Sequence, residues 1–203
     1  MTIELVIDFK ALCMWALIGY LIGSIPSGVI IARLMGLGNL REIGSGNIGA
    51  TNVLRTGSKK AAASTLLLDA GKGLAAVWLA LIFVDPAVAQ VVGFAAMLGH
   101  CFPIWLKFRG GKGVATFFGV IFALAWPVGL VAAIAWLGTA AVFRISSLAA
   151  LVAGVSAPVA AYRYGMLDIF FLMVCLWALI YLRHHANIQR LLDGTEGKIG
   201  SKS

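Results

Sequence analysis

Charged side chains are scarce in this sequence, and acidic ones are the scarcest. Asp, Glu, Lys and Arg make up 12% of the 203 residues, whereas hydrophobic residues make up 61%. A soluble domain carries roughly twice that charged fraction, and no stretch here is polar enough to form a separate soluble domain. We therefore expect residues 1–203 to form a single integral-membrane domain, all-α and polytopic.

Metal-ligand patterns and nucleic-acid-binding patterns are missing as well. Cys13, Cys101 and Cys175 lie in apolar stretches with neither ligand spacing nor an obvious pairing, so we interpret them as small buried hydrophobic residues. The net charge is +8, but no basic stripe with interleaved aromatic residues is present, so we expect no nucleic-acid partner. The basic residues flank apolar stretches instead, which suits anionic lipid headgroups and anionic substrates.

The apolar stretches predict the membrane spans. The stretch 113–143 would extend about 46 Å as one helix, well beyond a hydrocarbon core of about 30 Å. Trp126 and Pro127 lie near its middle, where proline disfavours a continuous helix. We therefore predict about seven transmembrane helices, several of them short. The predicted spans are 5–33, 61–84, 86–106, 112–125, 127–143, 147–162 and 166–184.

The distribution of basic residues predicts the orientation. With seven spans, thirteen of the sixteen Lys and Arg residues fall on one side, Lys10 and Arg163 fall on the other, and Lys72 lies within a span. A six-span alternative divides the residues outside the spans nine against six. The positive-inside rule favours seven spans, with the N-terminus outside and the C-terminus in the cytoplasm.

The segment 43–55 is a first candidate for a binding site, because small and polar residues gather there beside a long apolar run. Its glycines allow backbone N–H groups to turn towards one point, and its neutral side chains add hydrogen-bonding groups. Its arginine adds a cationic fork that suits phosphate. The candidate residues are Gly44, Ser45, Gly46, Asn47, Thr51, Asn52 and Arg55.

Two further polar clusters follow in the sequence. The segment 99–116 contains Gly110, Gly111, Lys112 and Gly113, a turn before a helix that can direct amides and an ammonium at an anion. It lacks the Walker A order, and a glycine turn with interfacial lysines is an alternative interpretation.

In the segment 183–196, His184 and Asn187 are three residues apart and share a helix face. Interfacial histidines without a function are the alternative here, and no ligand spacing supports a metal. With seven spans all three clusters lie on the cytoplasmic side, so we predict one shared polar site.

Two features within the spans are expected to be structural. Asp69 and Lys72 are three residues apart in the second span, so they can pair with each other; direct contact with a substrate is the alternative. Glycines, serines and a proline at 23–28 predict a kink or a close helix contact in the first span.

Together these segments resemble the bacterial membrane acyl-phosphate:glycerol-3-phosphate acyltransferases. The resemblance covers nearly the whole chain and rests on the segments 23–26, 44–55, 69–73 and 99–116, on His184, and on 187–196. Ile48 stands where relatives often have proline, which should adjust the loop without removing a ligand. The resemblance implies transfer of a fatty acyl group from acyl phosphate to the primary hydroxyl of glycerol 3-phosphate, giving lysophosphatidic acid and phosphate. It implies a bacterial inner-membrane enzyme with its site facing the cytoplasm; we expect a monomer in contact with membrane lipid, without cofactor or metal.

The resemblance also implies roles for individual residues. Arg55 and Lys112 would hold phosphate, Ser45 would bind a phosphate or the acyl carbonyl, and Asn187 would orient the acceptor or the oxyanion. His184 would accept the hydroxyl proton, unless a phosphate oxygen of a bound substrate does so. The neighbouring His185 is the alternative imidazole. The expected substrate-binding residues are Gly44, Gly46, Asn47, Thr51, Asn52, Gly110, Gly111, Gly113 and Glu196.

A small anion transporter or channel is the main alternative of another class. Such a protein should place polar groups along a path through the membrane, and it often shows internal repeats. The polar groups predicted here gather on one face, which favours an enzyme.

Overall fold

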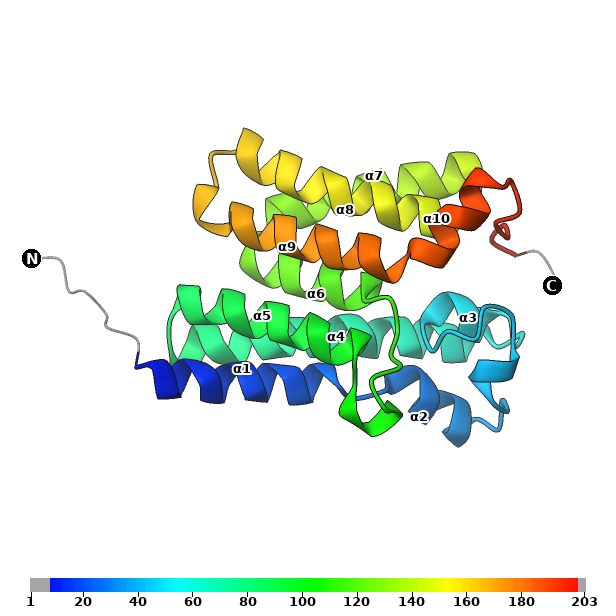
Figure 1. The fold of residues 1–203 in the computed structure, drawn as a ribbon, viewed down its shortest axis with the longest axis horizontal. Coiled ribbons are helices and arrows are strands. Elements are labelled where there is room, and N and C mark those ends of the chain that lie inside the picture. Colours follow the sequence, from blue (N-terminus) through cyan, green and yellow to red (C-terminus); the bar gives the residue numbers. More distant parts are fainter. Residues whose placement is uncertain (1–7, 201–203) are drawn as a thin grey trace, which may run out of the picture.

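The computed structural model describes residues 8–200, which fold into helices joined by loops. The helices lie roughly along one long axis, and the loops gather at its two ends (Figure 1). The all-α fold expected from the sequence is confirmed. Residues 5–7 of the first predicted span lie outside the described residues. In chain order the elements are α1 (Phe9–Gly23), α2 (Ser27–Leu34), η1 (Leu40–Glu42), α3 (Ala50–Leu54), α4 (Lys59–Phe83), α5 (Pro86–Cys101), η2 (Ile104–Leu106), α6 (Val114–Leu124), α7 (Trp126–Phe143), α8 (Ser146–Arg163), α9 (Leu167–Arg183) and α10 (His185–Leu192).

The first predicted span is broken into α1 and α2, as the sequence indicated. Pro26, which has no N–H to donate, lies between the two helices. A Cβ atom at Gly23 would lie 1.9 Å from the carbonyl oxygen of Ala96, and one at Gly28 would lie 1.9 Å from that of Ile48. These two glycines therefore let α1 and α2 pack directly against neighbouring backbone, and the predicted kink at 23–28 is confirmed.

The long apolar stretch 113–143 also forms two helices. α6 ends at Leu124 and α7 begins at Trp126, with Pro127 in the first turn, where a missing N–H costs little. α6 has 11 residues, so at about 1.5 Å per residue it is about half as long as a hydrocarbon core is thick. The prediction of two short helices in place of one long helix is confirmed.

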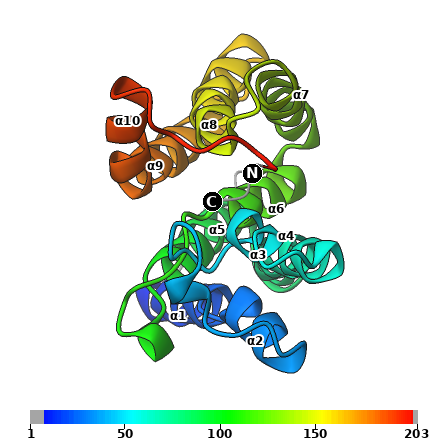
Figure 2. The ribbon, with the colours of Figure 1, turned by 90° about the vertical axis from the view of Figure 1, so that its right-hand side faces the viewer.

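Seen from one end, the helices form two groups (Figure 2). The helices α1, α2, α4 and α5 lie on one side, α7, α8 and α9 lie on the other, and α6 lies between them. A Cβ atom at Gly119 of α6 would lie 1.9 Å from the carbonyl oxygen of Ala70 in α4. Small residues thus set the close spacing of the helices, as is common where lipid surrounds a bundle.

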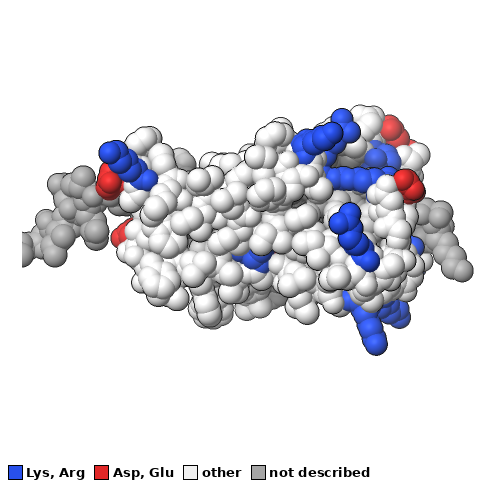
Figure 3. Space-filling view, turned by 90° about the horizontal axis from the view of Figure 1, so that it is seen from below, with Lys and Arg blue, Asp and Glu red and all other residues white. Residues whose placement is uncertain are grey.

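The surface is that of a membrane protein. Four helical segments of the described chain are long and apolar enough to cross a membrane, or five if α9 and α10, which meet at 64°, count as one span. On the face drawn in Figure 3, Lys and Arg gather towards one end, and the broad middle is almost free of charge. The chain is therefore a polytopic helical membrane protein, while the seven-span count and the orientation stay predictions.

A buried ion pair lies within α4. The Nζ atom of Lys72 lies 2.8 Å from Oδ1 of Asp69 and donates at 2.8 Å to the carbonyl oxygen of Ile25, in the break between α1 and α2. Nδ1 of His100 in α5 lies 3.5 Å from the same carboxylate oxygen. The pairing of Asp69 with Lys72 is confirmed, and it ties α4 to the break in the first span.

The interpretation of the cysteines is only partly correct. Cys101 is buried, whereas Cys13 and Cys175 are exposed on the outside of the bundle. An apolar side chain on a membrane helix has favourable surroundings on either face, because lipid is as apolar as the protein interior.

Candidate active site

The three polar clusters line one cavity of about 1530 Å³. The three clusters that the sequence analysis assigned to a shared site thus meet at one cavity, while the function of that cavity stays a prediction. The lining includes most of the candidate residues, namely Gly44, Ser45, Asn47, Thr51, Asn52, Arg55, Lys112, Gly113, His184, Asn187 and Glu196. The other three candidates, Gly46, Gly110 and Gly111, are not part of the lining.

Asn52 holds the first wall of the cavity together. Its Oδ1 atom accepts hydrogen bonds from the amide and the hydroxyl of Ser45, at 3.1 and 3.3 Å, and from Nη1 of Arg55, at 3.3 Å. Its Nδ2 atom donates to the carbonyl oxygens of Leu40 and Asn47. The carboxamide is thus fully occupied within the loop, so Asn52 orients Ser45 and Arg55 and has no donor left for a ligand.

Gly44 is needed for this arrangement. Its φ is +51°, and a Cβ atom there would lie 2.5 Å from Cδ of Arg55 and 2.8 Å from Oδ1 of Asn52. Ile48 donates its amide to Oδ1 of Asn47 at 2.8 Å, a bond that a proline at this position cannot make. The loop therefore folds so that Arg55 lies across Gly44 and faces the cavity.

The prediction that glycine amides converge on an anion is wrong for Gly46, Gly110 and Gly111. Their N–H groups donate to the carbonyl oxygens of Ile43, Cys101 and His100, at 2.9, 3.1 and 3.0 Å. These glycines serve close backbone packing, because a Cβ atom at Gly111 would lie 2.1 Å from Nε2 of His100. The positive groups that face the cavity are therefore side chains.

Lys112 precedes α6 and lines the cavity beside its first turn. Burial lowers the pKa of Lys112 to about 8, although the carboxylate of Glu196 opposes this shift. Three positive neighbours lower the same pKa further. They are Arg190, Arg55 and Arg183. An ammonium among so many cations gains most from a bound anion, because the anion offsets their repulsion.

His184 lies between α9 and α10 and is 2% exposed. Nδ1 of its ring lies 2.8 Å from the carbonyl oxygen of Ile180. A carbonyl only accepts hydrogen bonds, so Nδ1 carries the proton and Nε2 keeps a lone pair. Burial lowers the pKa of His184 to about 4, the bond to Ile180 opposes the shift, and the charge of Lys112 adds to it. The imidazole is therefore neutral at pH 7. His185, by contrast, is exposed.

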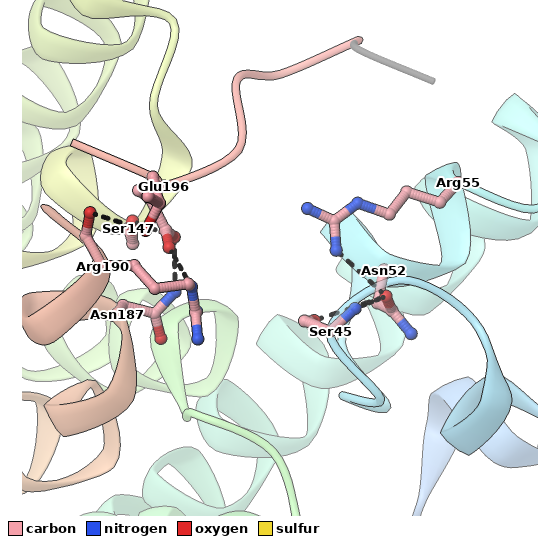
Figure 4. Close-up of polar contacts among 8 residues, drawn as sticks. Ser45, Asn52, Arg55, Ser147, Asn187, Arg190 and Glu196 are labelled. Atoms are coloured by element: carbon pink, nitrogen blue, oxygen red, sulfur yellow. Dashed lines mark hydrogen bonds and ion pairs between the residues drawn. The ribbon is translucent and has the colours of Figure 1, made fainter. Parts of the chain in front are cut away.

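Glu196 holds the second wall of the cavity (Figure 4). Its Oε1 atom accepts from Ser147 at 2.6 Å and from Nδ2 of Asn187 at 2.5 Å, while Oε2 accepts from Nε of Arg190 at 2.6 Å. Partial burial raises the pKa of Glu196, but these three hydrogen bonds and the charge of Arg190 together outweigh it, so the net pKa is lowered. The carboxylate thus joins α8, α10 and the C-terminal segment and keeps Asn187 in one orientation.

The sequence did not assign Ser147 or Arg190 to the site. Arg190 is three residues after Asn187, so helical spacing alone indicates a shared face. Ser147 follows the turn after α7, and nothing in its local sequence points to Glu196, which is 49 residues away. Thr51 of α3 links the loop around Asn52 to the start of α8, since its hydroxyl lies 3.2 Å from that of Ser146.

The cavity has an apolar arm as well as its polar end. The arm is lined by side chains of α4, α6 and α7. They include Leu66, Leu67, Leu74, Phe118, Phe122, Ala133, Trp136 and Leu137. Leu67 and Leu137 are also more than half exposed on the surface of the bundle, so the arm reaches the surface that faces lipid. A cavity with a cationic end and an apolar arm suits an amphiphilic anion. By fold and site, this is a polytopic helical membrane protein with a cavity whose lining suits such a molecule.

Comparisons with known proteins identify the family. A family model described as glycerol-3-phosphate acyltransferase matches residues 13–194. The chain is 60% identical over 191 residues to the glycerol-3-phosphate acyltransferase of Dinoroseobacter shibae, with 94% of each chain covered. It is 57% identical over 184 residues to that of Mesorhizobium japonicum, with 91% of this chain and 94% of the relative covered.

The fold is also similar to solved structures of PlsY (YgiH), an integral membrane glycerol 3-phosphate acyltransferase. The glycerol 3-phosphate form matches with a TM-score of 0.88 and 39% identity, and covers 94% of this chain and 96% of PlsY. The lysophosphatidic acid form matches with a TM-score of 0.85 and 37% identity, at the same coverage. The chain belongs to the glycerol-3-phosphate acyltransferase family. It is thus a membrane acyltransferase, and the transporter alternative is wrong.

Proposed function

We propose that this enzyme transfers a fatty acyl group from acyl phosphate to the primary hydroxyl of glycerol 3-phosphate. The products are lysophosphatidic acid and inorganic phosphate. The observation that carries the proposal is one cavity whose polar end contains Arg55 and Lys112 and whose arm is apolar. Two phosphate-bearing substrates need cations at one end, and the acyl chain of one of them needs an apolar groove at the other.

The chemistry of the site supports acyl phosphate as the donor. An acyl phosphate is a mixed anhydride, so its carbonyl is activated without a covalent enzyme intermediate. The cationic groups at the polar end are compact and suit phosphate. The described chain offers no additional domain for the nucleotide of acyl coenzyme A or for an acyl carrier protein.

We assign the roles from the groups that face the cavity. Arg55 and Lys112 hold phosphate, the hydroxyl of Ser45 binds a phosphate or the acyl carbonyl, and Asn187 orients the acceptor. Nε2 of His184 accepts the hydrogen bond of the attacking hydroxyl. Ester formation breaks the bond between the carbonyl carbon and the phosphate oxygen, and the hydroxyl proton leaves on the released phosphate.

The proton acceptor is better assigned to a substrate phosphate than to His184. An imidazole with a pKa of about 4 is a weaker base than a phosphate dianion, whose conjugate acid has a pKa of about 6. His184 then acts mainly by position, because it receives a hydrogen bond and aligns the hydroxyl.

We further propose that the enzyme lies in the bacterial inner membrane as a monomer, with the cavity open to the cytoplasm. The gathering of basic residues at one end supports this orientation. Single cysteines replacing Asp193 and Tyr164, both exposed, test it in a cysteine-free background. Labelling of Asp193→Cys from outside the cell, with Tyr164→Cys protected, would reverse the orientation.

A donor assay tests the reaction itself. Purified enzyme should form lysophosphatidic acid from acyl phosphate and glycerol 3-phosphate, and should be far slower with acyl coenzyme A or acyl carrier protein. Equal rates with acyl coenzyme A would refute the donor.

A pair of glycine variants tests the apolar arm. Gly71 of α4 lines the cavity and Gly138 of α7 does not, and both are exposed with nothing within 4 Å of an added Cβ atom. Gly71→Leu should lower the rate with long-chain acyl phosphates several-fold more than the rate with short-chain ones. Gly138→Leu should leave the chain-length profile unchanged. Equal profiles in the two variants would remove the acyl chain from this arm.

A further inference from the structure

Arg183, the last residue of α9, reaches from one group of helices to the other. Its Nε atom donates to the carbonyl oxygen of Gly111 at 3.1 Å, and Nη2 donates to that of Gly110 at 3.3 Å. The guanidinium lies over the ring of Phe102, with Cζ 5.0 Å from the ring centroid. Two hydrogen bonds to successive carbonyls use the planar fork of arginine, which the single ammonium of lysine cannot reproduce.

The loop that Arg183 binds is fixed from its other side by the end of α5. The amides of Gly110 and Gly111 donate to the carbonyl oxygens of Cys101 and His100, and the ring of His100 packs against the backbone of Gly111. The N–H groups of these two glycines therefore have acceptors in α5, and their carbonyl oxygens have a donor in α9. Because α5 and α9 belong to different helix groups (Figure 2), the turn joins the two groups.

The residues that follow Gly111 and Arg183 in the chain both belong to the candidate active site. Gly111 directly precedes Lys112, and Arg183 directly precedes His184. One side chain thus connects the backbone that carries the ammonium to the helix end that carries the imidazole. Both Lys112 and His184 line the cavity, whereas Arg183 does not belong to its lining.

We propose that Arg183 is a positioning residue that sets the place of Lys112 relative to His184 and Asn187. The proposal rests on the proposed function, since Lys112 is taken to hold a substrate phosphate. Arg183 acts through the backbone of the turn. The loss of its fork therefore moves Lys112 away from the phosphate and leaves the chemistry of His184 intact. The expected effect falls on the binding of glycerol 3-phosphate more than on kcat.

A double-mutant cycle separates this role from a general effect on folding. The variants are Arg183→Lys, Lys112→Ala and the double variant, with Arg163→Lys as control. Arg163 is exposed and is the last residue of α8, the helix whose first residues, Ser146 and Ser147, line the cavity. Binding of glycerol 3-phosphate is measured calorimetrically on the full-length protein in detergent, together with KM, kcat and the melting temperature. The binding measurement needs no acyl donor.

Arg183→Lys should weaken binding and raise KM about five- to tenfold, the loss expected for one or two hydrogen bonds. kcat should fall less than twofold, and the Arg163→Lys control should match wild type. The melting temperature should fall by no more than about 2–4 °C, the shift expected when a hydrogen bond worth about 1 kcal/mol is lost. The double variant should bind within about twofold of Lys112→Ala, because Arg183 has nothing left to position.

Three results would overturn the proposal. The first is wild-type binding by Arg183→Lys while Lys112→Ala binds weakly, which leaves the proposed function intact. The second is an additive loss in the double variant, which would mean that Arg183 acts independently of Lys112. The third is wild-type binding by Lys112→Ala, which would refute the phosphate role of Lys112 and the positioning role together. If Arg183→Lys fails to fold, Phe102→Leu, which removes the ring under the guanidinium, is measured in the same cycle with the same criteria.

Discussion

The two walls of the cavity are each built around one hydrogen-bonding side chain, but the two side chains differ in charge. Asn52 is neutral, and all of its bonds are to residues between Leu40 and Arg55. Glu196 is anionic, and it joins α8 and α10 to the segment that follows α10. The first wall is a local loop, whereas the second is assembled from distant parts of the chain.

The difference in charge decides what each wall offers to a ligand. Arg55 is held by the neutral carboxamide of Asn52, so its full charge is available to a phosphate. Arg190 is paired with Glu196, so most of its charge is offset. The first wall therefore suits the anionic part of a substrate, and the second wall, with His184 and Asn187, suits a neutral hydroxyl.

The largest effects are expected where cations are removed. Arg55→Ala and Lys112→Ala should each lower kcat/KM at least about tenfold, or about 1.4 kcal/mol, because a buried phosphate loses its partner. Arg55→Lys should recover only part of the rate, since a point charge does not replace the fork. Steady-state kinetics measure both, and the exposed Lys59, replaced by alanine, is the control. Wild-type turnover in both cavity variants would contradict the assignment of phosphate to this end.

Adding a charge at Asn52 and removing the charge at Glu196 tests the comparison of the two walls directly. Asn52→Asp places a carboxylate beside Arg55 and removes two donors from the loop, so KM for glycerol 3-phosphate should rise about tenfold. Glu196→Gln removes the charge that pairs Arg190 and leaves only one accepting oxygen, so either Arg190 or the pair Ser147 and Asn187 loses its acceptor. The melting temperature should therefore fall and kcat should decrease several-fold. The walls would be equivalent, against our expectation, if both variants changed KM and kcat alike.

The pH dependence should show the state of Lys112. A lysine whose pKa is lowered to about 8 carries its charge below pH 8 and loses it above, at a lower pH than a free lysine. kcat/KM for glycerol 3-phosphate reports the free enzyme, so it should decline above about pH 8. Lys112→Arg should move this decline to higher pH whatever its absolute rate, and an unmoved decline would assign it to another group.

The smallest effects are expected at the two histidines. His184→Gln should keep substantial activity if a substrate phosphate takes the proton, because the amide still accepts a hydrogen bond, whereas His184→Ala should lose more. With a pKa of about 4, His184 should add no acidic limb near pH 6.5 to the rate profile. His185→Ala should lie within about twofold of wild type. A severe loss in His185→Ala with little loss in His184→Ala would exchange their roles.

The helices and their breaks were predictable because they depend on local chain properties. Proline lacks an amide hydrogen and clashes with the preceding turn, so Pro26 and Pro127 marked the two interruptions. Residues three apart on a helix are neighbours, so the Asp69–Lys72 pair and the shared face of His184 and Asn187 followed from spacing. The predicted span count led us to expect that the three polar segments meet, and they do line one cavity.

The use of each polar group was decided only by the tertiary structure. A glycine in a polar loop permits an exposed amide, but it equally permits another backbone or ring to approach, and at Gly111 the ring of His100 does so. Asn52 was expected to bind substrate and instead saturates its bonds inside its loop. Ser147 and Arg183 act on residues 49 and 72 positions away. Dihedral preference and helical period are properties of short segments, whereas the partner of a hydrogen-bonding group is whichever group the packed helices bring within about 3 Å.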